Sequence, residues 1–495
     1  MYIGIDLGTS SIKAVRLNEE GKIIDIASEQ LSISHPHPLY SEQEPSEWWH
    51  KTEIVIQKLS QRNSLQSVKA IGLTGQMHGA VLLNKNYHVL HPAILWNDRR
   101  CTKECEEIMH LVPDAQEITG NIMMPGFTAP KIKWIAKHKP EIYTEIDKVL
   151  LPKDFLRFKM CGNFATDMSD ASGTMWLDVA KRDWSDKLLD ATGLNRSHMP
   201  YLFEGNEITG TLLPDVAKRW GMPIVPVIAG GGDNAAGALG VGLYRSGQAM
   251  LSLGSSGVYF VVNNGFYSSQ NAVHSFCHIL PNSWHLMSVM LNAANCLDWV
   301  AEITHHSSVS IMLDTIESQT DINIASPIFL PYLSGERTPH NDSNAKGLFW
   351  GLTHQHKRID FCRAVLEGIS FGLADGIDAL HKVKAGVTPE KITLIGGGAR
   401  SPYWRQMLAD VTGQVLEFRL GGDVGPALGA ARLAQIALNP FLSLKELLPE
   451  LPLEHVVRPN EKHYEIYQER RQSFSKIYQA LKSIYLPERH NGTTF

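Results

Sequence analysis

The sequence predicts an α/β protein built from two similar domains. A strand, a Gly-rich turn and a second strand occupy residues 5–12, and the same pattern returns at residues 251–258. A later strand that ends in a Gly-rich turn also occurs twice, at 71–75 and at 392–397. A chain of 495 residues is long enough for two large α/β domains. The repeat therefore indicates two domains joined near residue 245, with a cleft between them.

The repeat divides the chain into three parts. We expect an N-terminal domain at residues 1–245 and a C-terminal domain at residues 246–440. Four prolines lie within 440–460, which predicts a segment that wraps the surface. Residues 461–485 have helical spacing. The remainder, 441–495, is therefore expected to form a C-terminal wrap and helix.

Hydrophobic periodicity predicts the elements of the first domain in order. Residues 2–6, 12–17 and 22–27 are expected to be three strands joined by tight turns. Residues 47–59 have the spacing of an amphipathic helix. Residues 68–73 form another strand, which ends in a Gly-rich turn. Three strands, a helix and a further strand are typical of one α/β domain.

The second domain repeats this order of strands and turns with different residues. Strands are expected at 249–253 and 258–262, on either side of a short Gly/Ser turn. A later strand leads into a third Gly cluster, and a helix follows at 403–411. The similarity of the two halves favours a cleft to which each half presents one hairpin.

Composition excludes several classes of protein. Hydrophobic residues make up 43% and charged residues 20%, which are ordinary globular values. The net charge is −5 with no basic run, so a general nucleic-acid binder is excluded. No apolar stretch is long enough for a membrane span, and the first residues do not resemble a signal peptide. Six scattered cysteines without a CxxC pair favour a reducing, cytoplasmic location.

The two matching turns are candidate phosphate sites. Gly8, Thr9 and Ser10 form the first turn, and Gly254 and Ser255 begin the second. Such turns point backbone N–H groups and hydroxyls outward, which suits phosphate oxygens. A single turn is weak evidence, because hairpins commonly use Gly and Ser. Two turns at matching places favour phosphate binding.

The third Gly cluster is a candidate nucleotide contact. Gly397 and Gly398 lack side chains and would let a flat ring approach the backbone closely. The alternative is an ordinary tight turn between a strand and a helix. Other phosphate motifs are absent, because the chain has neither a Walker A loop nor a strict GxGxxG. A GxSxG motif is also absent, which counts against an α/β-hydrolase.

Asp6 ends the first strand beside the first phosphate turn. A carboxylate there would repel phosphate unless a cation intervened, and Mg²⁺ would resolve the conflict. The alternative is a surface Asp on an edge strand. Ser252 holds the matching place in the repeat, so one metal site is expected. Lys13 interrupts an apolar strand nearby and is either a phosphate contact or an outward-facing residue.

Asp233 follows three glycines and precedes an Ala/Gly-rich segment. An acid in this position is open on one side and partly desolvated on the other, which suits a general base for a hydroxyl group. The alternative is an N-cap that opens the following helix. The spacing alone leaves both interpretations open.

The Gly-rich motifs together resemble the actin, hexokinase and heat-shock chaperone ATPase superfamily. Two longer stretches are similar to the signatures of the FGGY carbohydrate kinases. They are Gly126-Phe-Thr-Ala-Pro-Lys131-Ile-Lys-Trp134-Ile-Ala-Lys-His138, and Gly347-Leu-Phe-Trp-Gly351-Leu352 continuing through Asp360-Phe-Cys-Arg-Ala364-Val-Leu-Glu367. The resemblance covers nearly the whole chain. It implies two ribonuclease-H-like, actin-like ATPase domains flanking a deep cleft, with sugar on the N-terminal side and nucleotide on the C-terminal side.

Within that family the chain is most similar to the members that act on ketoses. The resemblance implies transfer of phosphate from MgATP to the O5 hydroxyl of D-xylulose, in xylose breakdown, by a homodimer. Asp233 is then the base and Asp6 the Mg²⁺ ligand. The sugar pocket is implied to contain Met77, His78 and Asn234, with Trp96 and Asp98 near the sugar. The phosphate turns are implied to contain Gly8, Thr9, Ser10, Lys13, Gly254 and Ser255, with Gly397 and Gly398 near adenosine.

Alternatives remain open at this point. A kinase for L-ribulose, glycerol or another polyol would keep the same motifs. Gly126 argues against glycerol, because glycerol kinases tend to have an aromatic residue there and Gly would leave room for a longer sugar. An ATPase switch that acts on protein partners would need no acid on the sugar side. A sugar-binding module without catalysis would not need both Asp6 and Asp233.

Overall fold

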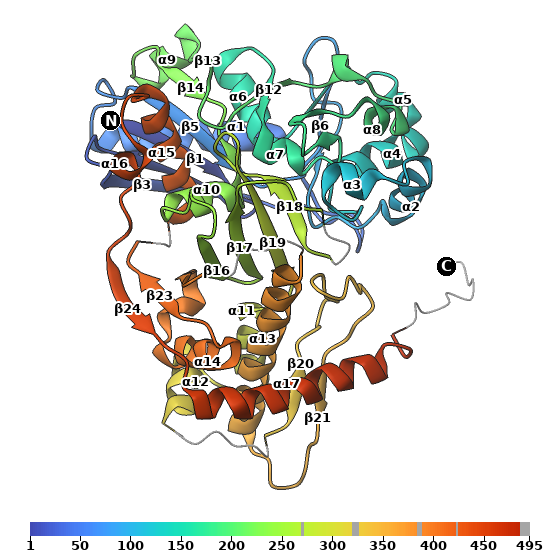
Figure 1. Cartoon of the computed structure of the whole chain (residues 1–495). Helices are drawn as coiled ribbons and strands as arrows, with labels where there is room; N and C mark the ends of the chain where they lie inside the picture. Colours follow the sequence, from blue (N-terminus) through green and yellow to red (C-terminus); the bar gives the residue numbers. More distant parts are fainter. Residues whose placement is uncertain (269–271, 319–325, 384–388, 422–423, 486–495) are drawn as a thin grey trace.

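The computed structural model describes residues 1–268, 272–318, 326–383, 389–421 and 424–485. Its strands form two large mixed sheets, one in each half of the chain (Figure 1). The first sheet has the order β13-β14-β5-β1-β2-β3 with β15 paired to β5, and the second has the order β18-β19-β17-β16-β22-β23-β24. The expected α/β class with two sheet-containing domains is confirmed.

The strands of the two large sheets have the following bounds. The first sheet contains β1 (Tyr2–Leu7), β2 (Ser11–Leu17), β3 (Ile23–Gln30), β5 (Ala70–Gly75), β13 (Ile208–Thr211), β14 (Pro226–Ile228) and β15 (Gly231–Gly232). The second contains β16 (Ala249–Leu253), β17 (Gly257–Asn263), β18 (His274–Cys277), β19 (Trp284–Met290), β22 (Ile392–Ile395), β23 (Leu416–Arg419) and β24 (Leu453–Val457). The five short pairs are β4 (Glu42–Gln43) with β7 (Ala93–Ile94), β6 (Val81–Leu83) with β8 (Lys148–Leu150), β9 (Ala165–Asp167) with β12 (Tyr201–Phe203), β10 (Leu177–Asp178) with β11 (Asp183–Trp184), and β20 (Ile328–Leu330) with β21 (Leu348–Trp350).

Helices cover both sheets. Those of the first half are α1 (Pro45–Arg62), α2 (Thr102–Leu111), α3 (Ala115–Thr119), α4 (Thr128–His138), α5 (Pro140–Tyr143), α6 (Pro152–Cys161), α7 (Met168–Ser172), α8 (Asp186–Ala191), α9 (Pro214–Trp220) and α10 (Asp233–Gly240). Those of the second half are α11 (Ala294–Ile303), α12 (Val309–Glu317), α13 (Arg358–His381), α14 (Pro402–Thr412), α15 (Gly425–Leu438), α16 (Leu444–Leu447) and α17 (Glu461–Leu481).

The two halves share one local arrangement. β1 pairs antiparallel with β2 and parallel with β5. In the second sheet, β16 pairs antiparallel with β17 and parallel with β22. Each half therefore presents a hairpin whose first strand lies beside a parallel strand, as the sequence repeat predicts.

α15 lies against the first sheet, although it comes late in the chain (Figure 1). A Cβ atom on Gly4 would lie 2.0 Å from the Ala427 carbonyl oxygen, and one on Gly72 would lie 1.9 Å from that of Ala430. Only glycine allows strands β1 and β5 to approach the helix backbone this closely. The sequence-based division assigned this helix to the second domain, and the boundaries at 245 and 440 stay a prediction.

The segment between α15 and α17 does more than wrap the surface. β24 pairs antiparallel with β23 and extends the second sheet by one strand. In Figure 1 it runs from α16, beside the first sheet, towards α17 in the other half. The expected C-terminal helix is confirmed as α17.

Candidate active site

Asp6 lies on β1, where it pairs with Lys13 on β2 and with Thr74 on β5. Its Oδ1 atom is buried and has no hydrogen-bond partner. Burial and the nearby carboxylate of Asp233 raise the pKa of Asp6 to about 7, although the charge of Lys13 opposes the rise. The mutual repulsion indicates that the two carboxylates lie near each other, and an orphaned buried oxygen of this kind fits a cation ligand.

Asp233 is the first residue of α10, directly after β15. Gly232 pairs with Gly75, so the edge of the first sheet fixes where this helix begins. Asp233 Oδ1 accepts hydrogen bonds from the backbone N (2.7 Å) and Nδ2 (2.9 Å) of Asn234. Burial raises the pKa of Asp233 to about 6 despite these bonds. The N-cap of α10 is Gly232, so the alternative in which Asp233 caps the helix is wrong.

Asn234 therefore orients the candidate base. Its side-chain amide donates to Asp233 within the described structure. We expected Asn234 to line the sugar pocket, and its amide has a second N–H and an oxygen with which it could contact a sugar. Gly232 donates its N–H to Ser169 Oγ (3.2 Å), which ties the base to α7.

Met77 and His78 lie beside this turn. A Cβ atom on Gly232 would lie 2.8 Å from Met77 Sδ. The Nδ1–H of His78 donates to the Gly173 carbonyl at 2.7 Å, because a carbonyl can only accept. Burial lowers the pKa of His78 to about 3, so the ring is neutral at pH 7. His78 has φ = 72°, an uncommon conformation for a residue other than glycine.

Lys131 fixes the backbone of His78, a role that the sequence analysis did not assign. Its Nζ donates to the carbonyl oxygens of His78 (2.7 Å) and Gly126 (2.8 Å). Burial lowers the pKa of this amine to about 7. A lysine inside an otherwise buried helical face was the available signal, and it lies within the first family signature.

Trp96 and Thr9 are joined by a hydrogen bond. Trp96 Nε1 donates to Thr9 Oγ1 at 2.9 Å, and the Thr9 hydroxyl donates to Gln76 Oε1 at 3.0 Å. Gln76 in turn donates to Gln43 at 2.9 Å. Thr9 was predicted as a phosphate contact, yet its hydroxyl is engaged by the residues beside Met77. Thr9 therefore lies on the side where the sugar is expected.

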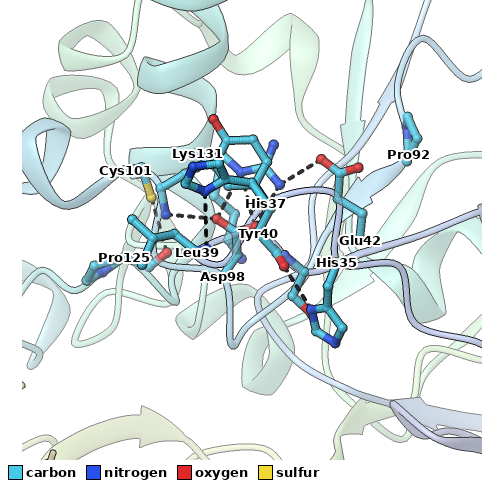
Figure 2. A network of polar contacts seen from close by, with 12 residues as sticks. His35, His37, Leu39, Tyr40, Glu42, Pro92, Asp98, Cys101, Pro125 and Lys131 are labelled. Atoms are coloured by element: carbon cyan, nitrogen blue, oxygen red, sulfur yellow. Dashed lines mark hydrogen bonds and ion pairs between the residues drawn. The ribbon is translucent and has the colours of Figure 1, made fainter. Parts of the chain in front are cut away.

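Asp98 was expected near the sugar, and that place stays a prediction. Its side chain is buried within the network of Figure 2, where it lies close to Leu39 and Tyr40. Asp98 Oδ2 accepts from the N–H of Ser41 at 2.7 Å and from Arg100 Nη2 at 2.7 Å. Oδ1 accepts from the N–H and Nε of Arg100. Both oxygens are occupied, so Asp98 anchors Arg100 and leaves no acceptor for a sugar.

Arg100 completes that network. Its Nη2 also contacts Glu42 Oε1 at 2.6 Å, and its guanidinium lies 3.6 Å from the centroid of the Tyr40 ring. Figure 2 shows Tyr40 close to Asp98, and it shows Glu42, on β4, at the other end of the network. The network holds residues 35–42 against the strand that leads to Trp96, and its role is to position rather than to bind.

Gly126 corrects an expectation. A Cβ atom there would lie 2.6 Å from the Trp96 carbonyl oxygen. The missing side chain is therefore required by close backbone packing, and the direction of the Cβ is not open space for a longer sugar. The guanidinium of Arg337 lies near the same point, with Nη2 at 4.0 Å.

The nucleotide residues predicted in the second half line one cavity of about 570 Å³. Gly254, Ser255, Gly397 and Gly398 all contribute to its wall, together with Trp404 from α14. This volume lies within the usual range for small-molecule sites, roughly 300–1,000 Å³. A Cβ atom on Gly397 would meet nothing within 4 Å, so this backbone faces open space.

The residues predicted in the first turn behave differently. Gly8 donates its N–H to the Ser11 carbonyl at 3.0 Å, which closes the turn. Ser10 is exposed, and its carbonyl accepts from Leu31. Lys13 lies opposite Asp6 on the paired strand, and its positive charge opposes the rise in the pKa of Asp6. A role for these residues at phosphate stays a prediction.

The described residues contain neither a candidate membrane-spanning helix nor a cluster of metal ligands. Within the described residues, no helix has both the length and the apolar character that crossing a bilayer requires. No group of three or more His, Cys, Asp or Glu side chains in the described ranges could hold a metal ion.

The chain belongs to the FGGY family of carbohydrate kinases. Residues 1–240 match the N-terminal domain of that family, and residues 249–438 match its C-terminal domain. The fold, the paired acids and the glycine-lined cavity agree with this class, whose members are ATP-dependent sugar kinases.

Named relatives narrow the class further. The chain is 61% identical to the xylulose kinase of Escherichia coli (strain K12), over 97% of this chain and 99% of that protein. It is 55% identical to the xylulose kinase of Klebsiella pneumoniae, over 98% of this chain and 100% of that protein. Among solved structures, a xylulose kinase from Brucella ovis is similar with a TM-score of 0.93 and 40% identity, covering 98% and 99% of the two chains.

Proposed function

We propose that the protein transfers the γ-phosphate of MgATP to the O5 hydroxyl of D-xylulose. The observation that carries the proposal is the 61% identity to a xylulose kinase over almost the full length of both chains. The candidate site supports it, because a buried acid, a neutral histidine and a glycine-lined cavity are the parts that this reaction needs. A role in xylose breakdown follows from the proposed product.

Asp233 acts as the general base in this proposal. With a pKa of about 6, it is mostly ionised at pH 7 yet basic enough to accept a proton from a hydroxyl in the transition state. Asn234 holds the carboxylate from one side through two hydrogen bonds to Oδ1. The proton moves from the sugar O5 to Asp233 as the oxygen attacks the γ-phosphorus, and the bond from that phosphorus to the β–γ bridging oxygen breaks to release ADP.

Asp6 is the proposed ligand for Mg²⁺, supported by its unpartnered buried oxygen. When bound, the ion neutralises negative charge on the phosphates. The charge of Asp233 raises the pKa of Asp6, which supports a place for both acids in one site. Met77 and His78 shape the sugar side, while Gly254, Ser255, Gly397 and Gly398 line the nucleotide cavity. Excluding water matters, because water competes with O5 as a nucleophile.

The location and assembly are part of the same proposal. All six cysteines are free thiols, which supports a reducing compartment such as the cytoplasm, where ATP is abundant. A homodimer stays a prediction.

The test is the release of ADP from MgATP with D-xylulose, L-ribulose, glycerol or no sugar. Strong release with D-xylulose alone is the expected result. Strong release with another polyol would keep the mechanism and refute the substrate. Release that is independent of sugar would favour an ATPase switch, and sugar binding without release would favour a binding module.

A further inference from the structure

Arg337 lies in the segment between β20 and β21, in the second half of the chain. Its backbone is fixed on β19. The next residue, Thr338, exchanges hydrogen bonds with Val289 at 3.0 and 3.1 Å. The N–H groups of Leu291 (2.8 Å) and Arg337 (2.7 Å) both donate to Glu336 Oε1. The base of the Arg337 side chain is therefore held firmly by the second sheet.

The side chain of Arg337 reaches the sugar side of the first half. Its Nη2 lies 4.0 Å from the point where a Cβ atom of Gly126 would be. The carbonyl oxygens of Gly126 and His78 both accept a hydrogen bond from Lys131, so Gly126 lies beside His78. The positive charge of Arg337 contributes to the lowered pKa values of His78 and His274. The guanidinium thus faces the His78 corner of the candidate pocket.

Within the described residues, the Arg337 guanidinium forms no hydrogen bond or ion pair with a side chain or carbonyl, although the residue is half-buried. The donors of this half-buried cation have no acceptor in the part of the chain that the structure describes, so an oxygen of a bound ligand can accept from them. The neighbouring donors are already engaged. Trp96 Nε1 donates to Thr9, Lys131 donates to two carbonyls, and His78 Nδ1 donates to Gly173.

We propose that Arg337 is a substrate-binding residue that the second half of the chain supplies to the sugar pocket, where it donates to the C2 carbonyl oxygen of the bound ketose. This inference rests on the proposed function. If O5 lies at Asp233, the ketone lies towards the opposite end of the sugar. A carbonyl oxygen only accepts hydrogen bonds, and guanidinium only donates them, so the two groups match.

The assignment has a consequence for specificity. A polyol has a hydroxyl at C2 in place of the carbonyl, and its oxygen is a weaker, tetrahedral acceptor. The pocket should therefore prefer D-xylulose to D-arabitol, which differs from it only by reduction at C2. Removing the guanidinium should reduce that preference, because it removes the group that recognises the carbonyl.

The experiment compares Arg337→Met, Arg337→Lys and wild type. Sugar binding is followed by tryptophan fluorescence without ATP, and turnover by ADP release. Hydrogen bonds to a charged group contribute about 1.5–3 kcal/mol, which corresponds to roughly 10–100-fold in affinity. Arg337→Met should weaken D-xylulose binding by that factor and D-arabitol binding by less than about fivefold. The KM for ATP should not change, and Arg337→Lys should fall between Arg337→Met and wild type.

Arg99→Met is the matched control. Arg99 is exposed and contacts the same segment through the Ser334 carbonyl at 3.2 Å, but has no place in the pocket. The Arg99→Met variant should bind D-xylulose and D-arabitol with wild-type affinity. If Arg337→Met binds D-xylulose with wild-type affinity, or loses affinity equally for both sugars, the carbonyl assignment is refuted. The proposed function would not be affected by either result. A wild-type protein that neither binds nor phosphorylates D-xylulose would refute the proposed function and this inference with it. If Arg337→Met fails to fold, the comparison of Arg337→Lys with wild type decides.

Discussion

The two hairpins share a backbone arrangement but differ in their chemistry. β1 places Asp6 between Lys13 and Thr74, whereas β16 places Ser252 between Val258 and Ile395. The first position is charged and desolvated, and the second is neutral. One repeated unit thus holds an acid where we propose the metal, and a small hydroxyl beside the cavity where we propose the nucleotide. Identical topology does not dictate identical function, because a single side chain changes which ligand the position can accept.

The largest expected effect is the loss of rate when the candidate base, Asp233, is replaced. Asp233→Asn should reduce the rate of D-xylulose phosphorylation by about 10²–10⁴, the range for loss of a general base. The substitution keeps the size of the side chain, so sugar binding by tryptophan fluorescence should remain within a few-fold of wild type. A rate loss below tenfold would contradict the role of Asp233 as base.

Asp6→Asn tests the other acid. We expect activity to fall on the order of 10²-fold, the cost of losing one group that stabilises charge in the transition state. Stability should move in the opposite direction. The folded pKa of about 7 lies above the ordinary value, so Asp6 stabilises the fold at low pH and this contribution disappears as pH rises through 7.

The melting temperature of the ligand-free protein separates the two effects of Asp6→Asn. At pH 8 the variant should be more stable than wild type by on the order of 4 kcal/mol, because it does not bear the cost of ionising a buried carboxyl whose pKa is raised by about three units. At pH 4 the two proteins should melt together. A variant that is less stable at pH 8 would show that the Asp6 charge is compensated within the fold.

The pH dependence of wild-type turnover provides a third test. Asp233 accepts a proton only when it is ionised, and its folded pKa is about 6. kcat/KM should therefore fall as pH decreases below 6, by about tenfold per pH unit. A limb that persists unchanged in Asp233→Asn would assign the titration to another group.

Ser252→Asp makes the second hairpin resemble the first. A new carboxylate beside the nucleotide cavity should repel the phosphates and raise the KM for ATP by roughly tenfold, equivalent to about 1.4 kcal/mol. The KM for D-xylulose should not change. Ser252→Ala is the control, and it should resemble wild type if the effect arises from charge.

Thr9→Val gives the smallest expected effect and decides which ligand the first turn serves. It removes the hydrogen bonds to Trp96 and Gln76, each worth about 0.5–1.5 kcal/mol. Because Thr9 contacts the sugar side, the KM for D-xylulose should rise several-fold while that for ATP stays constant. A rise in the KM for ATP with an unchanged KM for D-xylulose would instead support Thr9 as a phosphate contact.

Local pattern predicted the elements well, because alternating apolar residues determine strands regardless of what they pack against. The expected strand at 249–253 is β16 with the same bounds, and the helix at 403–411 differs from α14 by one residue at each end. The Gly-rich motifs also indicated which residues would line the cavity of the second half.

Local pattern did not predict the contacts between residues far apart in the chain. Asp98 was expected near the sugar, but its oxygens are occupied by Arg100 and Ser41. Gly126 was expected to leave space, but the Trp96 carbonyl fills it. Arg337 lies more than 200 residues along the chain from His78 and Gly126, which it approaches. Hydrophobic periodicity does not predict such contacts, because they depend on how segments far apart in the chain pack against one another.

Glycines bring the backbones of α10 and α15 into close approach. A Cβ atom on Gly240 would lie 2.1 Å from the Gly425 carbonyl oxygen, and one on Gly429 would lie 1.9 Å from that of Ala236. α10 begins at Asp233, and α15 leads through α16 into β24 of the second sheet. Peptide backbone is far stiffer than a side chain that can change rotamer. We therefore expect the two helices to move together, so that a rotation of the second sheet would also move the candidate base, Asp233.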